Sequence, residues 1–286
     1  MAISDIAVAV GGGAVAAAGA YAMLVEQFWL RVREIELSFS NLPPAFDGFT
    51  ILHLTDLHLT KTGLLEERLT KLVAEREVDA CFITGDITAD ARASGAFHRI
   101  CSVIRRREPI YAVLGNSEHK PWLDTDTLLQ SLVFDGMEML INSSAVIHRG
   151  SDSIAVVGVE DAYSRLDDLD AAFSGVAEDS FSILLSHCPS VAPRGIARGA
   201  DLILAGHTHG GQVRLPFMGT IWTHTHSNKA LNDGLYFPKD LRRFVKGDPG
   251  ESVLFVNRGV GTSKLHIRFL CRPEIAYITL RRAERP

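Results

Sequence analysis

The sequence predicts an α/β domain built in layers, and three observations support this class. Short apolar runs, typical of buried strands, alternate with segments of helical periodicity. Most of the apolar runs end in loops that contain Gly, Asp, Asn or His. Hydrophobic residues make up 47% of the chain, which is enough for a globular core. In such domains the loops at the carboxyl ends of the strands carry the functional residues.

The first element is an uncharged segment, residues 6–25. As a helix it would just cross a bilayer core of about 30 Å, although it is rich in Ala and Gly and therefore only modestly apolar. A cleaved signal peptide is the alternative, but no Lys or Arg precedes the run. We expect residues 1–33 to form a transmembrane helix with its juxtamembrane segment, giving a single-pass protein of the inner cell membrane. Two arginines after the segment weakly favour a cytoplasmic domain, and the side remains open.

Residues 34–286 are expected to form the second unit. Apolar runs predict strands at residues 34–39, 49–54, 80–84, 110–114, 154–158, 181–185, 202–205, 253–256 and 274–280. Helical periodicity predicts helices at residues 63–78, 94–107 and 123–134. A segment rich in Pro, Gly and basic residues, 215–250, is expected to lie over the site, because long loops inside compact domains are usually functional.

Five of the expected strands end in polar blocks. The blocks are D-x-H at Asp56–His58, G-D-x-x-D at Gly85–Asp90, G-N-x-E at Gly115–Glu118, S-H at Ser186–His187 and G-H-x-H at Gly206–His209. Each block alone is weak, because these residues are common in turns and a single histidine at a strand end is more often structural. Five blocks in this order, each after an apolar strand, are hard to assign to chance. They predict a metal site, and their mixed nitrogen and oxygen donors suit Mn²⁺, Fe²⁺ or Zn²⁺ better than Mg²⁺ or Ca²⁺.

The ordered blocks resemble those of the calcineurin-like metallophosphoesterase superfamily, which are D-x-H, G-D-x-x-D, G-N-H-[DE], H and G-H-x-H. The resemblance covers the chain from about Phe49 to its carboxyl terminus. Two segments, Gly206–Leu215 and Arg258–Leu280, are similar to a bacterial membrane-anchored or exported branch that includes phosphodiesterases and UDP-diacylglucosamine pyrophosphatases. The resemblance implies a four-layer α-β-β-α sandwich of two mixed sheets with a dinuclear metal site at the strand ends.

The resemblance also implies which residues hold the two divalent ions. The expected ligands of one ion are Asp56, His58, Asp86 and His209. Those of the second are Asp86, Asn116, His187 and His207. Asp86 would therefore bridge two ions about 3.5–4 Å apart, and a hydroxide shared by them would attack phosphorus in line. Asp90 is expected either to orient a ligand or to cap a helix.

One position departs from the family's pattern. Ser117 stands where the family has the histidine expected to protonate the leaving group. Loss of a general acid costs about 10²–10⁴ in rate when the leaving group is poor. Either His119, two residues later, replaces it, or the substrate has a leaving group that needs little protonation, such as a nucleotide pyrophosphate or an aryl ester. The catalytic candidates are Asp86, Asn116, Ser117 and His119.

Several residues outside the blocks leave alternatives open. Arg258, Arg268 and Arg272 could approach phosphate, since the guanidinium matches its oxygens, or could pair with acidic side chains. His224 and His226 could contact substrate or lie in a solvated loop.

The sequence thus predicts a membrane-anchored phosphohydrolase that uses two metal ions. It would cleave phosphomonoester, phosphodiester or pyrophosphate bonds, with a lipid-linked substrate such as a phospholipid or UDP-diacylglucosamine. The alternative, from another class, is a metal-binding scaffold with little turnover. Nucleic acid is not an expected partner, because the net charge is −5 and no basic stripe with interleaved aromatic residues is present. No protein partner is predicted.

Overall fold

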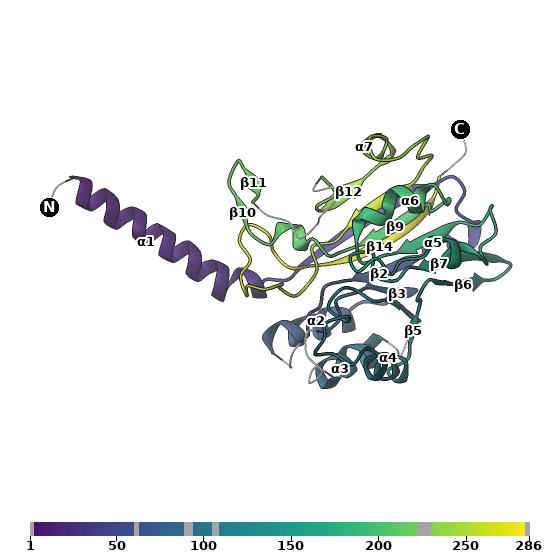
Figure 1. Cartoon of the computed structure of the whole chain (residues 1–286), viewed down its shortest axis with the longest axis horizontal. Coiled ribbons are helices and arrows are strands. Elements are labelled where there is room, and N and C mark those ends of the chain that lie inside the picture. The colour runs from purple at the N-terminus through teal and green to yellow at the C-terminus, as the bar shows by residue number, and fades with distance from the viewer. Residues whose placement is uncertain (1–2, 60–62, 89–93, 105–108, 222–229, 284–286) are drawn as a thin grey trace.

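Two six-stranded sheets form the centre of the fold (Figure 1). The computed structural model describes residues 3–59, 63–88, 94–104, 109–221 and 230–283. The first sheet contains, in spatial order, β1 (Arg31–Phe39), β14 (Glu274–Arg282), β2 (Thr50–Leu54), β3 (Ala80–Thr84), β4 (Ile110–Val113) and β5 (Met137–Met139). The second contains β12 (Gly234–Tyr236), β13 (Val253–Val256), β9 (Leu202–Ala205), β8 (Ser182–Leu185), β7 (Asp152–Gly158) and β6 (Ser143–Arg149).

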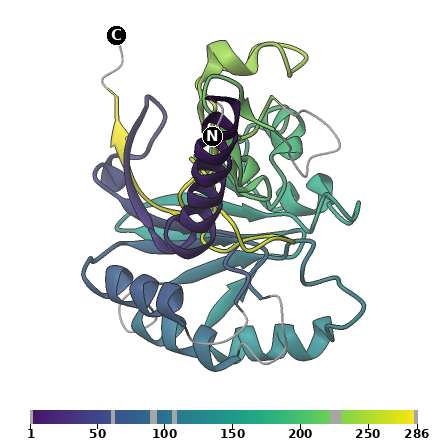
Figure 2. The same ribbon diagram turned by 90° about the vertical axis from the view of Figure 1, so that its left-hand side faces the viewer.

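Helices cover the outer faces of both sheets (Figures 1 and 2). The helices beside the first sheet are α2 (Leu64–Ala74), α3 (Ser94–Ile104) and α4 (Thr125–Phe134). Those beside the second are α5 (Leu169–Phe173), α6 (Ala192–Ile196) and α7 (Pro238–Leu241). A small ribbon of β10 (Arg214–Leu215) and β11 (Gly219–Thr220) projects beyond the sheets. The described part of the chain is thus layered as helix, sheet, sheet and helix.

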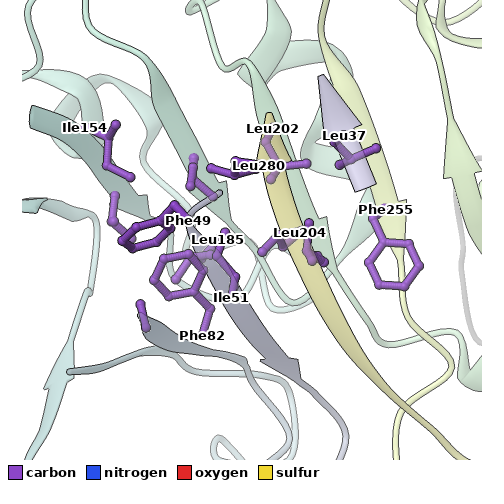
Figure 3. Packing of buried hydrophobic residues seen from close by; sticks show 14 of the residues in the cluster. Leu37, Phe49, Ile51, Phe82, Ile154, Leu185, Leu202, Leu204, Phe255 and Leu280 are labelled. Carbon is purple, nitrogen blue, oxygen red and sulfur yellow. The ribbon is translucent and has the colours of Figure 1, made fainter. Parts of the chain in front are cut away.

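The apolar core has three layers because the central strands are buried on both faces. Strand β3 shows the alternation: Phe82 faces the layer between the sheets, whereas Cys81 and Ile83 face the helices. In the middle layer, side chains of the first sheet such as Phe82 lie opposite those of the second, such as Leu204 and Phe255 (Figure 3). This double burial explains why these strands appear in the sequence as continuous apolar runs.

Parallel pairing brings the functional loops to one edge of the sandwich. Strands β2, β3 and β4 pair in parallel in the first sheet. Strands β7, β8, β9 and β13 do so in the second. Both sheets are mixed, because β14 runs antiparallel to β2 and β6 and β12 are antiparallel edge strands. The loops that follow the parallel strands therefore leave the sandwich on the same side.

The amino-terminal helix corrects one prediction. Helix α1 (Ile3–Leu24) projects from the sheets as a separate rod (Figure 1). No helix within the described ranges has both the length and the apolarity needed to cross a membrane. The prediction of an N-terminal transmembrane helix is therefore wrong. Ala and Gly, which carry little apolar surface, make up more than half of the 22 residues of α1.

Strand β2 contains a histidine that belongs to none of the predicted blocks. His53 is fully buried, with its Nε2 atom 2.9 Å from Thr84 Oγ1. Its Nδ1 atom has no hydrogen-bond partner among the described residues. Burial lowers the pKa of His53 from 6.5 to about 3. The folded protein therefore keeps this side chain neutral in mildly acidic solution.

We expect His53 to make folding less favourable as the pH falls. The unfolded chain takes up a proton near pH 6.5, whereas the folded protein does so only near pH 3. Its contribution to stability is therefore complete above pH 6.5 and is lost toward pH 3, by up to about 1.4 kcal/mol per pH unit. Chemical denaturation of the wild type and His53→Gln at neutral and mildly acidic pH measures the difference. Parallel pH dependences in the two proteins would contradict this assignment.

Candidate metal centre

The loops after β2, β3, β4, β8 and β9 meet at this edge and hold one another by backbone hydrogen bonds. The amide of Asp56 donates to Gly85 O at 3.0 Å, and that of His58 donates to Asp86 O at 2.9 Å. The amide of Gly206 donates to His187 O at 3.0 Å. All seven predicted ligands lie in these loops. Asp56, Asp86, His187, His207 and His209 are buried, and His58 and Asn116 are partly buried.

Three of the ligands form a first group around His209. Donor atoms of Asp56, His58 and His209 all lie within 4.8 Å of one another. His58 Nε2 is 3.2 Å from His209 Nε2, and His209 Nε2 is 3.4 Å from Asp56 Oδ1. The two imidazole rings are stacked, with centroids 5.1 Å apart. The donor atoms of these three residues are thus close enough to share one ion.

His187 is the centre of a second group. Donor atoms of Asp56, Asp86 and His187 lie within 4.8 Å of one another. His187 Nε2 is 3.3 Å from Asn116 Oδ1 and 3.1 Å from His207 Nδ1. The other ring nitrogen, Nδ1, is 2.9 Å from the carbonyl of Thr84 and can donate to it. That bond leaves Nε2 available to the group and fixes the orientation of the ring.

Asp86 lies between the two groups. Its Oδ2 atom is 3.3 Å from His58 Nε2, and its Oδ1 atom is 3.4 Å from His187 Nε2. The two carboxylate oxygens therefore point to different histidines, which is the arrangement that a bridging ligand requires. Asp56 is also close to both groups, since it belongs to each of the two sets of neighbouring donors.

Buried opposite charges shift the pKa values of this cluster. Burial opposes ionisation of Asp86, but His187 and His58 outweigh it and lower its pKa to about 2. Burial likewise opposes a charge on His187, whereas the nearby carboxylates, Asp86 first, raise its pKa to about 9. Burial raises the pKa of Asp56, and the charge of Asp86 adds to the effect. Binding of a divalent ion would replace protons as the positive charge of the cluster, so that protons are released.

A divalent cation fits these residues. Asp56 Oδ1 is buried and accepts no hydrogen bond from any residue that the structure describes. Such an oxygen is costly to bury unless a charge or donor compensates it. The surrounding donors are imidazole nitrogens, carboxylate oxygens and one amide oxygen, a set that suits Mn²⁺, Fe²⁺ or Zn²⁺.

The backbone is strained at most of these positions. Positive φ angles occur at Asp56 (48°), His58 (45°), Asp86 (50°), His207 (70°) and His209 (50°). A residue other than glycine in such a conformation costs about 1–3 kcal/mol and persists only where its surroundings enforce it. Because the strain is concentrated on the donor residues, it supports a function for this cluster beyond stability.

Two catalytic candidates, Ser117 and His119, lie in the loop after β4 that also carries Asn116. Ser117 is buried; its amide donates to Asp86 Oδ1 at 2.7 Å, and its Oγ atom is 3.4 Å from His58 Nδ1. His119 Nε2 is 2.9 Å from Glu160 Oε1, in the loop after β7. The pair of His119 and Glu160 therefore connects the two sheets at the edge that carries the cluster.

Glu118 has a role that the sequence did not reveal. Its Oε2 atom accepts hydrogen bonds from the amides of Gly115 (2.8 Å) and Asp86 (3.0 Å). Its Oε1 atom accepts from the amides of Ile87 (2.8 Å) and Thr88 (3.2 Å). Burial raises the pKa of Glu118 to about 8, with a further contribution from the charge of Asp86. The acidic residue that ends the G-N-x-E block was the only sequence signal for this connection between two ligand loops.

The arginines outside the blocks have structural partners. Arg258 pairs with Asp233 at 2.8 Å. Arg272 donates to the carbonyls of Trp29 and Leu30. Arg268 is fully buried and donates to backbone carbonyls beside the cluster. Three further residues considered from the sequence lie outside the described residues: Asp90, His224 and His226.

An α/β sandwich with a buried cluster of carboxylate, amide and imidazole donors is typical of metal-dependent hydrolases. The model of the family described as calcineurin-like phosphoesterase matches residues 49–211. The chain therefore belongs to that family and is a hydrolase of phosphoester bonds. This match confirms the prediction made from the ordered blocks.

Three relatives are similar over most of their length. The metallophosphoesterase YkuE of Bacillus subtilis is 29% identical over 96% of this chain and 94% of its own. The phosphodiesterase YaeI of Escherichia coli is 27% identical over 91% and 92% of the two chains. The UDP-2,3-diacylglucosamine pyrophosphatase LpxG of Chlamydia trachomatis is 26% identical over 82% and 85%.

We expect Glu118→Gln to destabilise the protein by about 2–3 kcal/mol. The amide has one oxygen, so two of the four buried backbone donors lose their acceptor and face an NH₂ group instead. Chemical denaturation measures the loss. A matched control is Glu138→Gln, because Glu138 is an exposed residue of the neighbouring strand β5. Equal stabilities of the two variants would show that Glu118 does not hold the loops together.

Proposed function

We propose that the protein hydrolyses a phosphodiester or pyrophosphate bond with two divalent metal ions held by the seven-residue cluster. The observation that carries this proposal is the position of Asp86, whose two oxygens face different histidines at 3.3 and 3.4 Å. The ions would supply Lewis acidity and lower the pKa of water toward neutrality. The expected ligand sets are those that the family resemblance implies: Asp56, His58, Asp86 and His209 for one ion, and Asp86, Asn116, His187 and His207 for the other.

The protein's own residues would fix the geometry of this reaction. Thr84 O orients the ring of His187, and the amide of Ser117 holds Asp86 Oδ1. The amide of His207 donates to Asp56 Oδ2 at 2.9 Å, which leaves Oδ1 for an ion. Side chains held in this way need little rearrangement when substrate binds, and such preorganisation is a large part of catalytic power.

The leaving group would be protonated by His119. Its pairing with Glu160 fixes one ring nitrogen and orients the imidazole. Ser117 does not take this role, because a serine hydroxyl is too weak an acid to donate a proton near neutral pH. A substrate with a good leaving group, such as a nucleotide pyrophosphate, would depend less on this proton.

A lipid-linked substrate is supported by a cavity beside the cluster. The cavity has a volume of about 260 Å³, and its walls include Gly211, two residues after His209. Its apolar side chains are Val213, Ile221, Leu265 and Ile267. An acyl chain or another apolar group next to the scissile phosphate would bury its surface there. The name of LpxG, a pyrophosphatase of a diacylated nucleotide sugar, agrees with this substrate class.

Metal-dependent hydrolysis by the full-length protein tests the function. We expect the metal-stripped protein to cleave an aryl phosphodiester only after addition of Mn²⁺, with activity that rises up to about two ions per chain. Asp86→Asn should lose nearly all activity, because its amide nitrogen cannot serve as a ligand. Asp170→Asn, a change on the surface of α5, is the control and should keep wild-type activity. Metal uptake without turnover of any phosphoester would instead favour a metal-binding scaffold.

The proton supply can be tested by restoring the family's histidine. We expect Ser117→His to accelerate cleavage of alkyl phosphodiesters by about tenfold or more, and of aryl phosphodiesters much less, because only the alkyl leaving group needs a proton. Steady-state rates on one substrate of each kind measure this. His119→Ala should slow cleavage of the alkyl substrate more than that of the aryl substrate. An equal effect of Ser117→His on both substrates would refute a role of this position in leaving-group protonation.

A further inference from the structure

Residues 21–30, which comprise the last turn of α1 and the chain that follows it, pack against a loop beside the metal centre. This loop, residues 257–273, connects β13 to β14, contains no predicted ligand and is called the strap here. Glu26 is 1% exposed and is the residue of the amino-terminal segment most deeply inserted against the strap. Its carboxylate accepts hydrogen bonds from the amides of Leu270 at 2.9 Å and Cys271 at 2.6 Å. A buried carboxylate with two backbone donors is a strong, directional anchor.

Other contacts of the segment reach the same part of the strap. Ala22 O accepts a hydrogen bond from the amide of Arg268 at 3.2 Å. The ring of Tyr21 packs edge-on against Phe269, with ring centroids 6.5 Å apart. The ring of Trp29 lies under the guanidinium of Arg272 at 4.1 Å, and the Nε atom of Arg272 donates to the carbonyl of Trp29 at 2.9 Å. The strap is therefore held at several consecutive residues.

The residues fixed by this segment contact His209. The thiol of Cys271, whose amide Glu26 holds, donates to His209 O at 3.3 Å. The guanidinium of Arg268 lies 3.5 Å from His209 Nδ1. A single residue, Cys271, therefore contacts both Glu26 and the predicted metal ligand His209.

The strap also contacts the β2 loop. Arg268 donates to Gly259 O and Gly261 O. The amide of Gly261 donates to Asp56 O at 2.7 Å, and a Cβ atom at Gly261 would lie 2.8 Å from that of His58. The strap therefore supports the backbone of Asp56 and His209 and packs closely beside His58.

We propose that Glu26 is a positioning residue of the metal centre, so that the segment after α1 is part of the catalytic architecture. The proposal depends on the metal site of the proposed function. By fixing the amides of Leu270 and Cys271, Glu26 holds the strap against His209 and sets the direction of this ligand. Residues that orient metal ligands in this way typically change metal affinity 10–100-fold when removed.

The test compares three variants of the full-length protein: Glu26→Ala, Glu26→Gln and the control Glu36→Ala, which removes an exposed carboxylate paired with Arg281. We expect Glu26→Ala to weaken Mn²⁺ affinity about tenfold in calorimetric titration. Its Co²⁺-loaded form should have an altered visible absorption spectrum, because His209 changes its geometry. Glu26→Gln keeps one acceptor oxygen and should be intermediate. The control should match the wild type. With an aryl phosphodiester as substrate, Glu26→Ala should have a lower kcat, whereas its KM should change less.

A purely structural role gives a different result. In that case Glu26→Ala would lower the melting temperature while Mn²⁺ affinity and the Co²⁺ spectrum stay at wild-type values, and the proposal would be wrong. If Glu26→Ala does not fold, Glu26→Gln provides the test. Wild-type Mn²⁺ affinity and a wild-type Co²⁺ spectrum in Glu26→Gln would also show that the proposal is wrong. These readouts need no turnover. A wild type that binds metal without hydrolysis would therefore refute the proposed function and leave the positioning role of Glu26 measurable.

Discussion

The close approach of loop backbones at the strand ends is the constraint on which the metal centre depends. A Cβ atom at Gly206 would lie 2.0 Å from Thr55 Oγ1, and one at Gly115 would lie 2.4 Å from Asp86 Oδ1. Only glycine permits these loops to come this close. Asp86 and His207, which directly follow Gly85 and Gly206, have left-handed backbone conformations. The G-D and G-H pairs in the sequence therefore combine a glycine required by close packing with a strained donor residue.

Strain and buried charge would make this edge unstable without compensating contacts. The carboxylates of Asp56 and Asp86 are surrounded by imidazoles, and each also accepts a hydrogen bond from a backbone amide in another loop. The carboxylate of Glu118 stabilises this edge in the same way, since it accepts hydrogen bonds from four backbone amides in two loops. The predicted ligands are thus held by the fold itself, so that the binding of an ion would not need to order them.

Much of this organisation follows from the sequence. Continuous apolar runs identified the central strands because burial on both faces leaves no polar alternation. The polar blocks predicted seven ligands, and the structure brings the loops that carry them together at one edge. The amino-terminal segment was misinterpreted as a transmembrane helix, since the absence of charge was given more weight than its Ala and Gly content. The roles of Glu26, Glu118 and Arg268 could not be predicted. Each forms hydrogen bonds with the backbone of residues distant in sequence. Because every residue except proline has the same backbone groups, such bonds do not require particular side chains in the partner residues and leave no motif in the sequence.

The strap illustrates why such residues matter for function. It contains none of the donors, yet Arg268 and Cys271 both reach the residue His209, whose ring nitrogen also faces His58 and Asp56. A shift of His209 would therefore alter the whole first ligand group, whereas the second group around His187 is supported by Thr84 O and the β4 loop instead. The two halves of the centre rest on different parts of the fold. Asp56 and Asp86 are close to both halves. A change near α1 would therefore act first on the half around His209 and reach the other half only through these two carboxylates.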